Sequence, residues 1–171
     1  MTVAFSVHTD LSGLGRLALK FPRLTQMEVK RALTEICLTL TRTIKAELPS
    51  ASGYMRASVA WTVTLDAAAG LMEGRVFSQV PWVRPFELGA RPGKWPPRVE
   101  LEWWAEIKAK RHAFIRKMGV KQFAFVVARN IKRRGQAGHF VFRNTLRAAE
   151  GYIHGRLSAA VTRVIQRVNR G

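Results

Sequence analysis

The sequence contains few of the residues from which catalytic and metal-binding sites are usually built. Its 171 residues include one cysteine, four histidines and eleven carboxylates. The single cysteine, Cys37, excludes an internal disulfide, and its apolar neighbours indicate a small buried core residue. The histidines show no metal-ligand spacing among themselves or with Cys37. We therefore expect no metal site.

A glycine-rich phosphate-binding loop is also absent. Gly13 and Gly15 lack the third glycine of a dinucleotide-binding loop and follow no convincing strand. Three nearby carboxylates, Glu100, Glu102 and Glu106, are predicted to lie on a helix as counter-charges to the lysines that follow. A nuclease would need a denser acidic cluster to hold its metal ions. We expect a protein that is not an enzyme, with no catalytic residues and no cofactor.

Long apolar runs are missing as well. No stretch of eighteen apolar residues occurs, which predicts no membrane-spanning helix, and we expect no membrane among the partners. The 47% hydrophobic content is nevertheless typical of a folded chain. At this length the sequence fits one domain, which we expect to span residues 1–171.

Acidic residues are scarce relative to basic ones. Twenty-nine lysines and arginines give a formal net charge of +18, and the isoelectric point is near 11.6. Such an excess indicates a polyanionic partner, which could be nucleic acid, an anionic membrane surface or an acidic protein surface.

The periodicity of apolar residues predicts an α+β fold. Residues 2–7 and 55–65 alternate as strands do, and 71–80 reads as a second strand of a hairpin with 55–65. A brief helix is expected near 14–21, and a long N-terminal helix over 23–48. Two basic helices follow within 99–134, and a last helix covers 144–168. We expect a small antiparallel sheet packed by the long N-terminal helix and the C-terminal helix, with the basic helices inserted.

The segment 81–97 interrupts this pattern. It holds five of the seven prolines together with Trp82, Phe86 and Trp95. Proline fixes φ and donates no backbone hydrogen bond, so the segment is predicted to be a rigid loop and not a helix interior. Two interpretations remain open, because the loop could pack on its own domain or contact a neighbouring subunit.

Two clusters of cations are the candidate contacts with DNA or an acidic partner. They are Lys108, Lys110 and Arg111, and Lys132, Arg133 and Arg134. Part of the second cluster has a local reason, because cations are favourable at a helix C-terminus. The last helix also carries a row of arginines, which is either a solvated face or a contact surface. No recognition-helix, zinc-finger or RNA-binding signature is present.

Three segments in a fixed order resemble the small head–tail joining, neck and tail-completion proteins of long-tailed double-stranded DNA phages. The first is LPSASGYMRASV at 48–59, which is similar to the entry into that family's first long strand. The second, WVRPFELGARP at 82–92, resembles its aromatic–Glu–hydrophobic–Gly–x–Arg–Pro signature. The third is IKRRG at 131–135 followed by HFVF at 139–142, which resembles its lead into a final helix.

The resemblance implies a structural subunit of the virion, assembled in the cytoplasm of a bacterial host. It would form a ring, expected to be a hexamer, and contact other head–tail connector and tail proteins, with double-stranded DNA in the lumen. Subunit contacts are expected at Trp82, Phe86, Arg91 and Trp95. The alternative is a sequence-nonspecific DNA-binding protein, which would need no ring.

Overall fold

The computed structural model describes residues 3–10, 22–49, 53–66 and 71–170. Their contacts divide the chain into two compact units. The sheet unit is built mainly from Ala4–Glu47, Val59–Phe77 and Phe142–Gly171. The inserted unit is built mainly from Leu48–Ser58 and Ser78–Val141. The helix expected near 14–21 lies outside the described residues.

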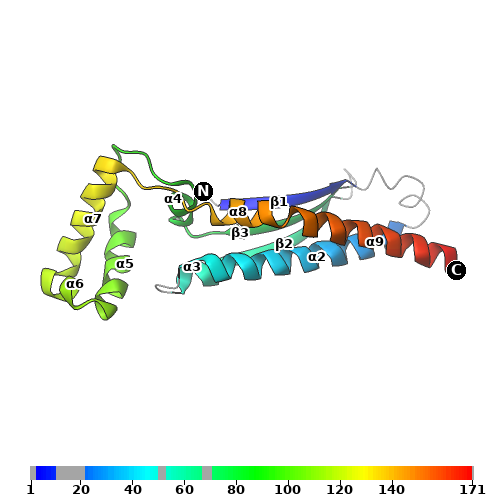
Figure 1. Ribbon diagram of the computed structural model, residues 1–171, viewed down its shortest axis with the longest axis horizontal. Coiled ribbons are helices and arrows are strands. Elements are labelled where there is room, and N and C mark those ends of the chain that lie inside the picture. The colour runs from blue at the N-terminus through cyan, green and yellow to red at the C-terminus, as the bar shows by residue number, and fades with distance from the viewer. Residues whose placement is uncertain (1–2, 11–21, 50–52, 67–70, 171) are drawn as a thin grey trace. The chain divides into compact units, whose positions relative to one another are not determined.

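The sheet unit contains three antiparallel strands: β1 (Val3–Asp10), β2 (Val59–Asp66) and β3 (Leu71–Ser78). Strand β3 lies between the other two (Figure 1). In β3 the even positions are buried, from Met72 through Val76 to Ser78, which is the period of two that one covered face requires. The expected hairpin of β2 and β3 is confirmed.

Helix α2 (Pro22–Glu47) covers this sheet, as the apolar stripe predicted. Pro22 is its first residue, and the N–H that proline lacks would have no partner within the helix at that position. Leu33, Ile36, Leu40 and Ile44 are fully or almost fully buried. Gly74 of β3 permits the close approach, because a Cβ there would lie 2.9 Å from Sγ of Cys37. Val29, Leu33 and Met72 form the centre of the core.

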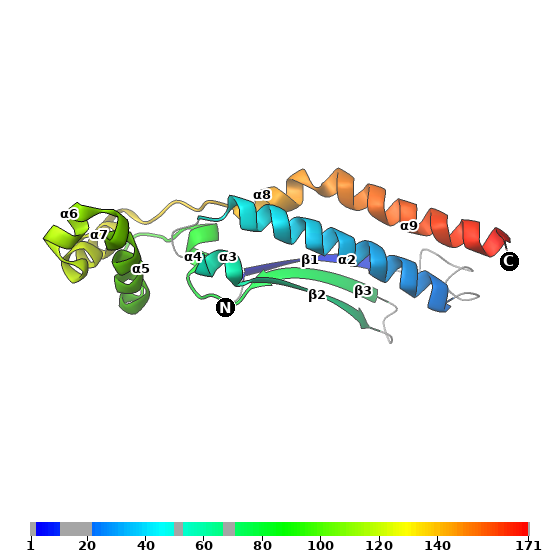
Figure 2. The ribbon, with the colours of Figure 1, turned by 90° about the horizontal axis from the view of Figure 1, so that it is seen from below.

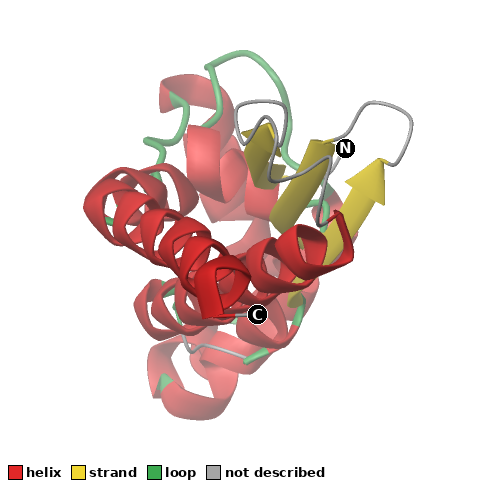
Figure 3. Ribbon diagram, turned by 90° about the vertical axis from the view of Figure 1, so that its right-hand side faces the viewer, coloured by secondary structure: helices red, strands yellow, loops and turns green. Residues whose placement is uncertain are grey.

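The C-terminal segment forms two helices, α8 (Val141–Ala148) and α9 (Glu150–Arg170). The prediction of one helix over 144–168 is wrong in its start and in its continuity. The chain turns at Ala149, whose N–H is shared between the carbonyls of Thr145 and Leu146 at 3.1 Å each. Helix α9 lies beside α2 on the same face of the sheet (Figures 2 and 3), and Leu157 packs against the core.

The inserted unit begins with a helical turn where a strand was expected. Residues Tyr54–Ala57 form α3, so the strand predicted from residue 55 starts only at Val59. Gly53, at φ +70°, supplies the left-handed residue before the turn. The N–H of Ala57 donates to the carbonyl of Gly53 at 2.9 Å and closes the turn. Apolar alternation at 55 and 57 therefore did not encode a strand.

A short helix also stands inside the proline-rich segment. Helix α4 (Val83–Leu88) includes Pro85, so the expectation of an entirely non-helical loop over 81–97 is wrong for these residues. Pro85 is the third residue of the helix, where no intrahelical partner exists for its missing N–H. The remaining residues up to Pro97 form no helix or extended strand, as predicted, and Ala90 makes a single β-bridge.

Three basic helices complete this unit, where two were predicted: α5 (Arg98–Arg111), α6 (Ala113–Met118) and α7 (Val120–Arg134). The extended backbone of His112 separates α5 from α6. Helices α5 and α7 pack side by side. Ala105 and Ala109 of α5 and Ala124 and Ala128 of α7 are buried, and their small side chains allow close packing. Gly119, at φ +94°, turns the chain between α6 and α7.

This arrangement confirms the α+β fold class, with the small antiparallel sheet, the two packing helices and the inserted basic helices. Among the described helices, none combines the length and the apolarity that crossing a bilayer would require.

Candidate interaction surface

The second and third resemblance segments are paired in space although about 45 residues separate them. Ala90 and Gln136 form an antiparallel bridge, with N–H to O distances of 2.9 and 2.8 Å. The pairing continues from the N–H of His139 to the carbonyl of Phe86 at 2.9 Å. The rings of these two residues stack with centroids 4.3 Å apart. This paired segment connects the two ends of the helical insertion.

Three glycines make the pairing possible. A Cβ on Gly89 would lie 2.5 Å from the carbonyl oxygen of Gln136, and one on Gly135 would lie 2.4 Å from that of Ala90. A Cβ on Gly138 would lie 2.5 Å from the carbonyl oxygen of Glu87. Gly89 and Gly135 also have positive φ, at 79° and 74°. Gly89 and Gly135 of the two resemblance segments, and Gly138 between the two parts of the third segment, are thus required by close backbone contact.

The first resemblance segment joins the same unit through an aromatic cluster. The ring of Tyr54 lies 5.6 Å from those of both Trp82 and Trp103, and the two tryptophans are 5.8 Å apart. Arg56 donates from Nε to the carbonyl of Leu48 at 2.7 Å, which anchors the helical turn α3. Trp82, a predicted subunit contact, therefore packs largely within its own unit.

A second group of aromatic residues is exposed and contacts a cation. Trp95 stacks on Phe125 with centroids 5.8 Å apart, and the two residues are 50% and 57% exposed. The ammonium of Lys132 lies 4.6 Å from the centroid of the Trp95 ring, within the range of a cation–π contact. The N–H of Gly93 donates to the carbonyl of Lys132 at 2.7 Å, which holds the loop against the end of α7.

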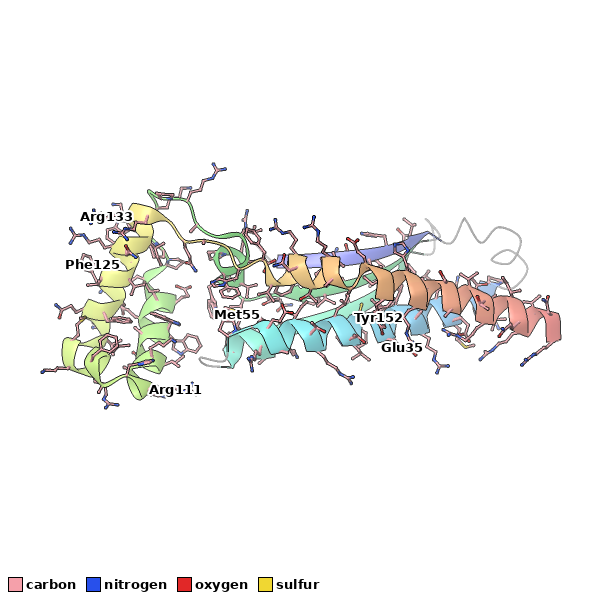
Figure 4. The ribbon with its side chains drawn as sticks, viewed as in Figure 1. Glu35, Met55, Arg111, Phe125, Arg133 and Tyr152 are labelled. Atoms are coloured by element: carbon pink, nitrogen blue, oxygen red, sulfur yellow. The ribbon has the colours of Figure 1, made fainter. Side chains whose placement is uncertain are left out.

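The structure does not bring the two predicted basic clusters together. Lys108, Lys110 and Arg111 end α5, whereas Lys132, Arg133 and Arg134 end α7, and the two ends lie at opposite ends of the helical pair (Figure 4, residues Arg111 and Arg133). Lys108 lies over the Trp104 ring at 5.8 Å. Instead, Trp95, a predicted subunit contact, lies against Lys132, a member of the second predicted cation cluster. The structure thus joins one residue from each of these two predicted sets.

In the sheet unit, part of the arginine row of α9 is bound to α2. Nε of Arg163 donates to Oε2 of Glu28 at 2.9 Å, and Arg167 lies 3.2 Å from Oε1 of the same carboxylate. Arg156 binds Glu35. Glu28 is almost fully buried, and the hydrogen bond from Arg163 holds the pKa of its carboxyl below the usual range. These arginines are therefore structural, which sequence spacing did not indicate.

The sheet unit also has a surface hollow of about 350 Å³ between α2 and the β2–β3 hairpin. Its lining contains no carboxylate, cysteine or histidine and consists of Arg23, Gln26, Met27, Lys30, Val63, Thr64, Leu65 and Met72. The lining groups that could exchange a proton or act as a nucleophile are Lys30 and Thr64, and no carboxylate or histidine of the lining lies beside them to activate them. Within the described residues, no group of three histidine, cysteine or acidic side chains could hold a metal ion.

Comparison with models of known protein families, with curated proteins and with solved structures found no match for this chain. The candidate interaction surface is therefore defined by the geometry of this chain's residues alone. Phe125 was not predicted as a contact, because its position on α7 agrees with a helix interior as well as with an exposed ring. The buried partner of Arg163 was not predicted either.

Proposed function

We propose that this protein is a structural subunit of a phage virion that acts at the junction of head and tail, or at the end of the tail tube. The observation that supports this best is the convergence of the three resemblance segments in one unit. Two of them pair through their backbones, and the first joins them through Tyr54 and Trp82. Short motifs that are far apart in the sequence support a family resemblance more strongly when they contact one another in the fold.

The exposed features of the inserted unit suit binding. Its helices and the preceding loop present half-exposed aromatic rings and many cations. Residues 91–134 contain thirteen lysines and arginines and only three glutamates. Joining a filled capsid to a tail requires stable contacts between proteins and no turnover. Such a subunit would assemble in the host cytoplasm and remain in the virion.

A ring of these subunits would concentrate positive charge. Six copies at +18 each would repel one another unless salt, DNA in the lumen or acidic neighbours offset the charge. The proposal therefore includes homo-oligomerisation into a ring, contacts with other connector and tail proteins, and proximity to DNA or acidic protein surfaces.

The test is the mass of the purified protein in solution, measured by light scattering and native mass spectrometry between low and high ionic strength. The measurement is repeated with a short DNA duplex and with tail tubes lacking their terminal ring. We expect a closed ring on the tubes, with little dependence on DNA at physiological salt. A monomer that ignores the tubes under all conditions would overturn the proposal.

Sequence-nonspecific DNA binding is the second candidate, and the excess of cations in residues 91–134 favours it. A protein of this kind should shift stoichiometrically onto duplex DNA without forming a ring. Its affinity should fall steeply with salt, because neutralising phosphates releases bound counterions. The same titration therefore separates the two functions.

A further inference from the structure

The exposed rings Trp95 and Phe125 lie on a loop and on a helix face that also carry cations, and we call this set of residues the aromatic–cationic patch. Positions 125, 129, 132 and 133 fall on one side of α7, because residues three, four, seven and eight apart share a helix face. Figure 4 places Phe125 and Arg133 on the same side of the helix. The loop adds the Trp95 ring. The patch consists of Arg91, Lys94, Trp95, Phe125, Arg129, Lys132 and Arg133.

Within the described residues, the cations of the patch have no carboxylate partner. None of the five forms an ion pair, whereas Arg98 of α5 is paired with Glu102. Neither the loop from Gly89 to Pro97 nor helix α7 contains an aspartate or a glutamate. The patch therefore has an unopposed positive charge, which is complementary to an acidic surface.

A second copy of this chain does not supply such a surface. Its eleven carboxylates are scattered, and the densest group is Glu100, Glu102 and Glu106. Glu28 and Glu35 are already bound to arginines of α9. The partner that fits is therefore a different molecule with a net negative charge.

The two rings favour a protein segment over duplex DNA. Protein interfaces combine an apolar centre, rich in tryptophan and phenylalanine, with a charged rim that includes arginine. The Trp95–Phe125 stack is about half exposed and contacts the cation of Lys132, which suits such an apolar centre beside a charged rim. The backbone of duplex DNA offers phosphates to cations and leaves such rings in water.

We propose that the aromatic–cationic patch binds an acidic protein segment that also carries apolar side chains, in which carboxylates pair with the cations and an apolar residue covers the Trp95–Phe125 stack. The inference rests on the proposed function, because the acidic segment is taken to belong to another protein of the virion. Arg91 and Trp95 were expected at contacts between identical subunits of the ring. The inference assigns them instead to a contact with a different protein.

The test uses the full-length protein and a labelled twelve-residue peptide that contains six glutamates, two leucines and a phenylalanine. A second peptide has glutamine in place of every glutamate, and a 20-base-pair duplex serves as the DNA probe. We expect the acidic peptide to bind and the glutamine peptide not to bind. The variant Phe125→Ala should weaken peptide binding by roughly tenfold or more, as expected for a central aromatic contact.

Matched variants provide the controls. Phe114→Ala removes a ring of the same type and the same 57% exposure on α6, and it should leave peptide affinity unchanged. Lys132→Gln with Arg133→Gln should weaken peptide binding, whereas Lys110→Gln with Arg111→Gln, which removes the same charge at the other end of the helical pair, should have a much smaller effect. Circular dichroism spectra should match for all variants.

Two results would overturn the inference. One is equal loss of peptide binding in the patch variants and their controls, which would indicate general charge attraction only. The other is loss of DNA binding as large as the loss of peptide binding in Phe125→Ala, which would make nucleic acid the occupant. Neither result changes ring formation on tail tubes, so failure here is distinguishable from failure of the proposed function.

Discussion

The buried carboxylate of Glu28 in α2 accepts a hydrogen bond of 2.9 Å from Nε of Arg163 in α9. Arg167 approaches the same carboxylate at 3.2 Å. One acidic residue, 1% exposed, thus binds two arginines of the facing helix. This contact joins the two long helices of the sheet unit.

The first prediction concerns the stability that this contact provides. Glu28→Gln should lower the free energy of unfolding by about 1–3 kcal/mol, because it leaves the charge-assisted hydrogen bonds of Arg163 and Arg167 without an acceptor charge. Glu35→Gln is the matched control. Its carboxylate is one-third exposed, so the loss should stay within about 1 kcal/mol. Urea unfolding of both variants measures the difference, and equal losses would contradict the prediction.

The second prediction concerns acid. The hydrogen bond from Arg163 is the main reason that the pKa of Glu28 is lowered from its ordinary 4.5, and burial acts in the opposite direction. A lowered folded-state pKa contributes stability above the unfolded value, and that stability is lost as the pH falls through the folded value. The stability difference between wild type and Glu28→Gln should therefore be constant above about pH 5.5 and shrink below pH 4.5. Unfolding curves at intervals between pH 7 and pH 3 test this, and a constant difference throughout would refute it.

The third prediction uses two glycines with opposite surroundings. Gly138→Ala should destabilise the inserted unit by about 1–3 kcal/mol, because the new Cβ would overlap the backbone of Glu87 and Leu88. Gly155→Ala, in the exposed face of α9 with no atom within 4 Å of the new Cβ, should stabilise the sheet unit by about 0.5–1 kcal/mol. Hydrogen exchange resolved by segment would report both changes, and the same sign for both would count against the described geometry.

The fourth prediction separates two tryptophans of the proline-rich segment. Trp82→Ala should lower the free energy of unfolding by about 1–3 kcal/mol, because it removes ring contacts with Tyr54 and Trp103. Trp95→Ala should lower it by less than about 1 kcal/mol, since the ring is half exposed. Near-ultraviolet circular dichroism and urea unfolding would distinguish them. A larger loss for Trp95→Ala would mean that its ring has a structural role.

The fifth prediction concerns Cys37. Burial raises the pKa of its thiol to about 11, so at pH 8 the reactive thiolate is scarce and inaccessible. In native buffer the thiol should react with a disulfide reagent at least about a hundred times more slowly than glutathione does, and at a comparable rate in denaturant. Fast labelling of the folded protein would show that α2 separates readily from β3.

Apolar periodicity predicted the elements of the sheet unit well. Helix α2, strand β3 and most of α9 were expected within a few residues of their bounds, because one side of each is buried and must be apolar at a regular interval. The failures were local. At Met55 and Ala57 two apolar residues matched a strand pattern by chance, and Pro85 did not prevent a helix because it fell in the first turn.

The contacts that define the candidate site required tertiary structure. Composition determined that the protein is strongly basic, and residue pattern determined that it has an α+β fold with inserted helices. Neither indicates that Ala90 meets Gln136, that Glu28 meets Arg163, or that Trp95 meets both Phe125 and Lys132. Periodicity is a property of neighbouring residues, whereas these pairs form when distant segments are brought together by burial of the cores. The sequence by itself determined which residues could bind, and only the tertiary structure decided which of them share a surface.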